Sequence, residues 1–262
     1  MEICHMANRK IIILSKCLIS ALFVSFCIPA DSLDIFMAAI KNRSNLDIHY
    51  FWMNSIIYGG IYGYYFIYIL AGMPYADSFC CEYCQGIWRY LIMRMGTKKY
   101  AVRKFIIAFC LGGLTASGGG LLFITALKSV LPLFQSGRAI EVTFLPCSEI
   151  LIKNPEKYFL IMLYIMLLAG GMWTTISVCI SAYCPVNYFV HLIPFIGIFL
   201  LTRFNSMLHL PDKWRLDFWL CGRAGLEQPY VYILLLTVSV TVLMSICCWL
   251  FYKKVKWRVL NE

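Results

Sequence analysis

The chain has 262 residues, of which 61% are hydrophobic and only 14% are charged. A soluble domain carries about a quarter charged residues, so the composition excludes a soluble globular fold. It indicates an all-α polytopic membrane protein with one transmembrane domain, residues 1–262. The formal net charge is +10, but the cations gather at the ends of apolar segments. That distribution serves membrane orientation, and we therefore expect no nucleic acid partner.

The first apolar segment, residues 11–30, follows Arg9 and Lys10 and has the basic start and apolar middle of a secretory signal. A signal cleavage site needs a small residue at its last position and another two positions earlier. Ala30 fits the last position, but Ile28 does not fit the earlier one, and Pro29 lies between them. We therefore predict a retained membrane span.

Five further spans and their connections follow in chain order. Polar loops at 31–50 and 128–157 are expected outside the cell. Residues 184–187 carry no charge and predict a tight hairpin before a short span that contains Pro194. Residues 203–228 mix aromatic and charged side chains, which is typical of interfacial or membrane-dipping helix. The predicted spans after the first are 51–73, 105–127, 158–183, 188–201 and 230–252.

Small residues predict close packing within the bundle. Gly59 and Gly63 lie four residues apart in the second span, and the third span contains Gly112, Gly113, Gly118, Gly119 and Gly120. Glycines let helix backbones approach closely in a membrane, so we expect tight packing or a bend in the third span. Cys147 and Cys221 both fall in outer loops, and a disulfide between them is one arrangement that the sequence leaves open.

Residues 74–104, between the second and third spans, are rich in lysine and arginine. With six spans, both termini lie on the same side as this segment, and its cations predict the cytoplasmic side of the plasma membrane. Winding Asp77 to Met95 at about 100° per residue gives an amphipathic helix. Its predicted polar side holds Glu82, Gly86 and Arg89, and its apolar side holds Ile87, Trp88, Leu91, Cys80, Cys81 and Cys84.

The chain lacks the sequence features by which a transporter binds ATP or couples transport to an ion gradient. A phosphate-binding loop needs a glycine, four residues and then Gly-Lys-Ser/Thr, and the nearest match at Lys98 lacks both glycines in those places. Ion-coupled transporters usually carry acids or paired charges at membrane depth, whereas the predicted spans hold only Lys16 near one end and His191. We therefore assign no catalytic, cofactor-binding or metal-binding residue to this chain.

Two weaker patterns suggest enzymatic or metal chemistry. Ser117 and His191 lie on different spans and are the candidate pair for an intramembrane serine hydrolase. The glycine expected two residues before the serine is absent, however, because Thr115 stands there. Cys81 and Cys84 form a Cys-x-x-Cys pair, but no second pair completes a four-ligand zinc site, so burial is the preferred interpretation.

The segment between the second and third spans resembles that of the membrane subunit of type-2 ABC exporters. In particular, it is similar to the small Firmicute permeases grouped with lantibiotic and bacteriocin-immunity exporters. The family pattern has an acidic residue, a glycine four positions later, several basic residues and then Tyr-x-x-x-Lys at the start of the third span. The matching residues here are Glu82, Gly86, Arg89, Arg94, Tyr100 and Lys104.

This resemblance implies a permease subunit that exports a peptide, an antibiotic or another amphiphile. The amphipathic segment would be a coupling helix seated in a separate ABC ATPase subunit, with Glu82 and Arg89 in polar contact with it. ATP and Mg²⁺ would be bound by that ATPase, and a second permease chain, like or unlike, would complete the pathway. The alternatives are the serine hydrolase above and a non-transporting membrane immunity or scaffold protein. Substrate and transport direction are left open.

Overall fold

The computed structural model describes residues 2–42, 46–135, 147–223 and 228–261, and these residues form helices and turns without a strand. Five helices are long and apolar enough to cross a membrane. They are α1 (Glu2–Ala30), α7 (Thr97–Leu127), α9 (Pro155–Ser181), α10 (Asn187–Met207) and α12 (Pro229–Asn261). The chain is therefore a multi-pass α-helical membrane protein, as the composition predicted.

The predicted second span, residues 51–73, is broken. Residues Ile48–Ile57 and Ile61–Gly72 form two helical pieces that meet at an angle of 69°. The first piece consists of α3 (Ile48–Trp52) and the π-helical η1 (Met53–Ile57), and the second of the π-helical η2 (Ile61–Phe66) and α4 (Ile67–Gly72). Gly59 lies at the break with a φ of +80°, a left-handed conformation that favours glycine. The second span therefore stands as a bent pair of helices, either one broken span or a re-entrant loop, and the break was not predicted because the apolar composition continues across the backbone turn.

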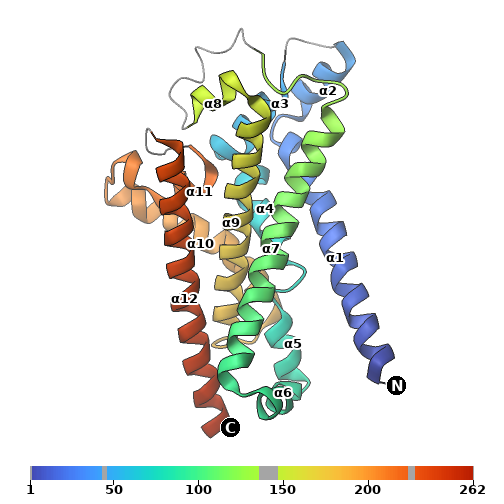
Figure 1. Ribbon diagram of the computed structural model, residues 1–262, viewed down its shortest axis with the longest axis vertical. Helices are drawn as coiled ribbons and strands as arrows, with labels where there is room; N and C mark the ends of the chain where they lie inside the picture. The colour runs from blue at the N-terminus through green and yellow to red at the C-terminus, as the bar shows by residue number, and fades with distance from the viewer. Residues whose placement is uncertain (1, 43–45, 136–146, 224–227, 262) are drawn as a thin grey trace.

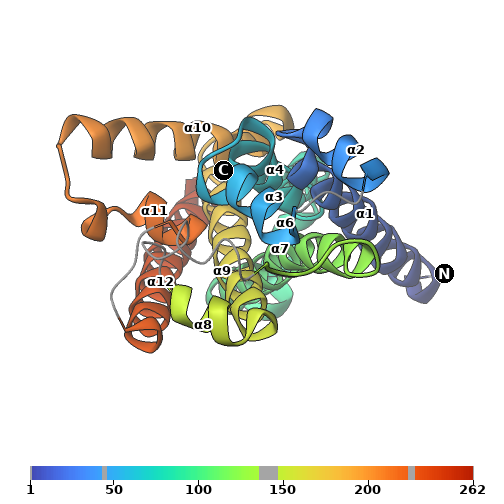
Figure 2. The ribbon, with the colours of Figure 1, turned by 90° about the horizontal axis from the view of Figure 1, so that it is seen from above.

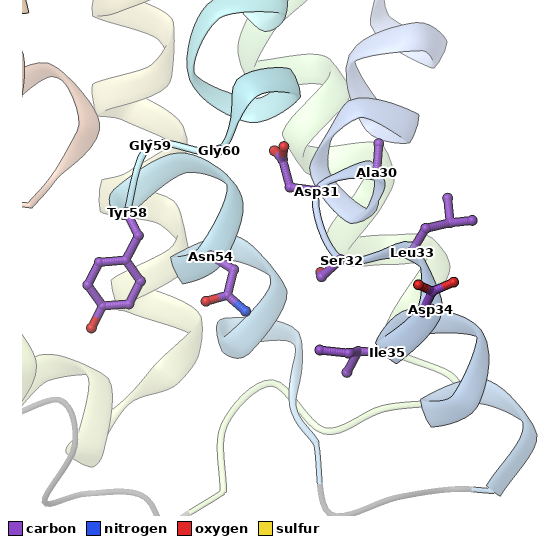
Figure 3. A pocket seen from close by; sticks show the side chains of 10 residues that line it. All are labelled: Ala30, Asp31, Ser32, Leu33, Asp34, Ile35, Asn54, Tyr58, Gly59 and Gly60. Atoms are coloured by element: carbon purple, nitrogen blue, oxygen red, sulfur yellow. The ribbon is translucent and has the colours of Figure 1, made fainter.

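A carboxylate from a distant turn holds this break. Asp31 follows α1, and its side chain accepts hydrogen bonds from Ser55 Oγ at 3.0 Å and from the backbone N–H groups of Tyr62 and Gly63 at 3.1 and 2.9 Å. The first N–H groups of a helix have no partner within it, so Asp31 caps the second piece from outside. Figure 3 shows the Asp31 side chain directed toward Gly60 at the edge of a hollow of about 620 Å³.

The helices α7 and α9 form the centre of the bundle, with α1 and α12 on either side of them (Figure 1). The glycines of α7 allow these close approaches. A Cβ atom at Gly112 would lie 2.1 Å from Thr174 Oγ1 of α9, and one at Gly119 would lie 2.3 Å from Val24 of α1. The prediction of tight packing along the third span is therefore confirmed.

The remaining long helix and the short helices lie around this bundle. The helix α10 continues through Pro194 to Met207, longer than the predicted 188–201, and leans away from the bundle in both views (Figures 1 and 2). Both termini lie at the end of the molecule that holds α5 (Ser78–Cys84) and α6 (Ile87–Met95). The short helices at the other end or beside it are α2 (Leu33–Asn42), α8 (Ser148–Lys153), the 3₁₀ turn η4 (Asp212–Trp214) and α11 (Leu216–Cys221).

Candidate functional site

The segment between the second and third spans folds as two short helices rather than the single predicted one. Gly86 has a φ of +69° and separates α5 from α6. Gly96 has a φ of +81° and separates α6 from α7. Both values lie in the left-handed region that glycine adopts without strain. A continuous helix from Asp77 to Met95 was therefore a wrong prediction, and every face assigned beyond Gly86 has to be taken from the structure.

Three of the six predicted site residues meet inside the protein. Glu82 of α5 accepts hydrogen bonds through Oε2 from Tyr100 Oη at 2.5 Å and from Lys104 Nζ at 2.5 Å, both on α7. The side chains of Glu82 and Lys104 are only 8% and 2% exposed. A buried charge is stable only when it is paired and hydrogen-bonded, and here each charge supplies the partner of the other. In the structure Glu82 is therefore an internal link to α7, whereas the helical projection placed it on the polar side of the helix.

Aromatic rings surround this ion pair. The Lys104 ammonium lies 5.2 Å from the ring centre of Tyr100, 5.8 Å from that of Phe79 and 5.9 Å from that of Tyr75. Cations are attracted to ring faces at such distances. Phe79 in turn packs edge-on against Phe251 of α12, with ring centres 5.2 Å apart. The rings thus join α5 to both α7 and α12.

The end of α12 adds a second link. Arg258 is buried, its Nε donates a hydrogen bond to the backbone carbonyl of Ala182 at 3.0 Å, and its guanidinium lies 4.5 Å from the ring centre of Tyr83. Ala182 ends α9, where helix carbonyls lack partners and carry partial negative charge. Arg258 therefore joins α12, α9 and α5.

The outward side of α6 carries a mixed basic and apolar surface. We call it the α6 face and define it as Arg89, Tyr90, Met93 and Arg94, which are all exposed. Met93 is 79% exposed and Tyr90 is 61% exposed, whereas Trp88 and Ile92 on the opposite side are buried. Tyrosine, methionine and arginine are the residues that protein interfaces favour. The sequence argument missed Tyr90 and Met93 because it considered only the polar and charged residues on the Glu82 side of the helical projection, although both residues also project to that side.

The remaining residues of this segment agree in part with the exposure predicted from the sequence. Gly86 is the break itself, and Arg89 and Arg94 lie on the α6 face. Ile87 was predicted to be buried but is exposed, and so is Cys84, while Cys80 is buried as predicted. Within the described residues, no group of three or more His, Cys, Asp or Glu side chains lies close enough to hold a metal ion.

The candidate serine–histidine pair is not brought together by any described interaction. Ser117 donates a hydrogen bond to the Gly113 carbonyl of its own helix at 2.9 Å. His191 Nε2 lies 3.9 Å from the Asp77 carboxylate, near the start of α5. Lys104 marks the part of α7 that contacts α5, and Ser117 follows it by thirteen residues, which is about 20 Å further along the helix. Ser117 therefore lies far along α7 from the region of α5 that His191 approaches. Burial tends to raise the pKa of Asp77, but attraction to His191 and Lys16 outweighs it and holds that pKa below its usual value.

Cys147 and Cys221, the pair left open by the sequence, are both buried free thiols. Burial raises the pKa of Cys147 to about 11 and that of Cys221 to about 12. Both thiols are therefore protonated at neutral pH, and a protonated thiol is a poor nucleophile.

The fold and the apolar helices define a multi-pass membrane protein with a rigidly attached helical element, α5 and α6, at one end. No protein-family model, curated protein or solved structure matches the chain.

Proposed function

We propose that the chain is the permease subunit of an ABC exporter, and that α5 and α6 form its coupling element. The observation that carries the proposal is the combination of a fixed inner side and a free outer side on one short helical element. The inner side is anchored by the Glu82–Lys104 ion pair. The outer side is the α6 face, which exposes Tyr90 and Met93 between two arginines.

A coupling element has to meet two physical requirements. It must present a surface that a partner can hold, and it must pass the partner's movement to the spans without bending. A buried, hydrogen-bonded ion pair resists separation because pulling it apart leaves an unpaired charge in an apolar environment. Movement of α5 is therefore transmitted to α7 through Glu82 and Lys104, and from α7 to α9 through the close contact at Gly112.

The division of labour follows from the residues present. In this proposal a separate ABC ATPase subunit binds ATP and Mg²⁺ and docks on the α6 face, while this chain, with a second permease chain, forms the pathway. The substrate class is a peptide, an antibiotic or another amphiphile, as the resemblance implies. The exposed positive charge of the α6 face is complementary to an acidic groove on the partner, and such complementarity favours fast and specific docking.

The test is co-purification of an ATP-hydrolysing subunit with the tagged chain from membranes of its own host. Tyr90→Asp places a charge in the centre of the α6 face and is expected to abolish co-purification, because a buried unpaired charge at an interface is costly. Tyr230→Asp is the matched control, since Tyr230 is 79% exposed but lies at the start of α12, at the opposite end of the molecule from α6 (Figure 1). Tyr230→Asp should leave the complex intact. Recovery of the chain without any ATPase, or equal recovery with Tyr90→Asp, would contradict the proposal.

A further inference from the structure

A second and smaller cavity lies beside the break in the second span, on the side of α10 and α11. Its volume is about 140 Å³. Tyr58, Tyr64 and Tyr65 line it from the broken span, and Thr202, Phe218 and Arg223 line it from the opposite side. At roughly 30 Å³ for each water molecule, the cavity has room for one small polar group and not for a nucleotide.

Among the described residues, the charged side chains that line this cavity are Asp217 and Arg223. Asp217 also lines the cavity, but it is buried and its carboxylate accepts from Asn205 Nδ2 at 2.7 Å and from the Arg215 guanidinium at 2.8 Å. Asp217 and Arg215 therefore cancel. Arg223 remains, and within the part of the chain that the structure describes no carboxylate forms an ion pair with it.

The Arg223 side chain is nevertheless held in place. Its guanidinium lies 4.5 Å from the ring centre of Phe218, and its backbone N–H donates to the Phe218 carbonyl at 2.9 Å. Stacking on a ring orients the planar guanidinium and leaves its N–H groups free at the edge. Arg223 is exposed, so these N–H groups at the edge of the cavity can be reached by an anion from outside the protein.

The remaining polar lining supplies hydrogen-bond donors rather than a competing negative charge. Thr202 Oγ1 is buried, and its one described neighbour for a hydrogen bond is the Tyr64 hydroxyl, which also lines the cavity. The Cys221 thiol, which also lines the cavity, is neutral because burial raises its pKa to about 12. Guanidinium and hydroxyl donors together match the oxygens of a phosphate group.

We infer that this cavity binds a phosphate group, with Arg223 as its charged partner and Thr202 as a hydrogen-bond donor. The exposed ring of Tyr58 accommodates the adjoining apolar part where the phosphate belongs to an amphiphile. This site does not depend on the proposed coupling to an ATPase, because binding is measured on the purified chain alone. The ligand is either a membrane phospholipid head group or a free phosphate, and the experiment separates the two.

The experiment measures the thermal unfolding midpoint of the full chain in maltoside detergent during titration with short-chain phosphatidylglycerol. A ligand that binds only the folded state raises the midpoint in proportion to its affinity. Separate titrations use uncharged diacylglycerol of the same chain length and inorganic phosphate. We expect phosphatidylglycerol to stabilise the protein and diacylglycerol to have no comparable effect. Equal stabilisation by inorganic phosphate alone would show that the ligand is a free phosphate.

Substitutions locate the effect. Arg223→Gln should weaken phosphatidylglycerol binding by about 10- to 100-fold, the usual loss for a hydrogen bond to a charged group. Arg203→Gln is the control, since Arg203 is also stacked on a ring, that of Phe199 at 5.4 Å, but does not line the cavity. If Arg223→Gln does not fold, Thr202→Val tests the same site through a smaller loss of affinity. The inference would be overturned if Arg223→Gln bound phosphatidylglycerol as tightly as the unsubstituted protein. If Arg223→Gln does not fold, unchanged binding by Thr202→Val would overturn it. Equal effects of charged and uncharged lipid would overturn it as well.

Discussion

Substituting one member of the Glu82–Lys104 pair should destabilise the end of the bundle that holds α5 and α6, which the sequence predicts to be cytoplasmic. Because the two side chains are only 8% and 2% exposed, water cannot take over the role of the missing partner. Removing one member of a buried ion pair typically costs about 3–5 kcal/mol. We expect Glu82→Gln and Lys104→Met each to fall in this range, since each leaves the opposite charge buried.

The double substitution separates the ion pair from simple packing loss. Glu82→Gln combined with Lys104→Met leaves no buried charge, so its cost should be smaller than the sum of the single costs by about 2–3 kcal/mol. The assay is equilibrium unfolding in mixed detergent micelles, followed by tryptophan fluorescence, to which the buried Trp88 beside Phe79 and Tyr83 contributes. Glu156→Gln is the control, because its partner Lys128 and Glu156 itself are 57% and 71% exposed, and it should leave stability unchanged.

The reasoning would be refuted if each single substitution cost less than about 1 kcal/mol, the range of surface ion pairs, or if the costs of the two simply added. The same geometry makes Glu82→Lys unsuitable as a test of partner contact. That change would place two buried ammonium groups against each other and would disturb the fold before any docking could be measured.

Three further predictions concern the bundle and the end of the molecule opposite α5 and α6. Gly112→Leu should prevent stable folding of the bundle because its side chain would overlap Thr174 of α9. Gly118→Leu should be tolerated because no neighbouring atom lies within 4 Å of a Cβ at that position. The yield of folded protein in size-exclusion chromatography is compared between the two variants. Asp31→Ala removes three hydrogen bonds to the broken span and should cost about 2 kcal/mol in the same unfolding assay; a cost near zero would show that the cap is dispensable. Since burial raises the pKa of Cys147 to about 11 from the ordinary 9.0, folding favours the protonated thiol, and that contribution to stability is present below pH 9 and lost as the pH rises through about 11. Alkylation of Cys147 and Cys221 in the folded protein should accordingly be slow at pH 8 compared with exposed Cys84, and equal rates would contradict their burial.

The spans were predictable from the sequence because hydrophobic length alone determines them. The first span, residues 11–30, and the apolar course of α7, α9, α10 and α12 agree with the helices found. The helix ends were less predictable. The helix α7 begins at Thr97 and α12 continues to Asn261, because the basic residues before and after an apolar run are themselves good helix formers.

The broken second span and the two-helix segment were missed for one physical reason. A single glycine in the left-handed conformation, Gly59 or Gly86, changes the direction of the chain without changing its hydrophobic pattern. A signal for the ion pair was present in the sequence. Tyr100 and Lys104 lie four residues apart and therefore on one face of a helix, where both can reach one acidic partner, although a lysine near the end of a span can also extend to the membrane surface. Nothing local, however, identified Glu82 as that partner.

The most direct test of the central claim is photo-crosslinking in intact host membranes. A photoreactive phenylalanine analogue replaces Met93 on the α6 face, or Met37 on α2 at the other end of the molecule (Figure 1). Both positions are well exposed, so both probes are equally free to react. The account predicts a cross-link to an ATP-binding subunit from position 93 and none from position 37. A cross-link from position 37 alone, or none from position 93 in cells that retain the transport activity, would contradict it.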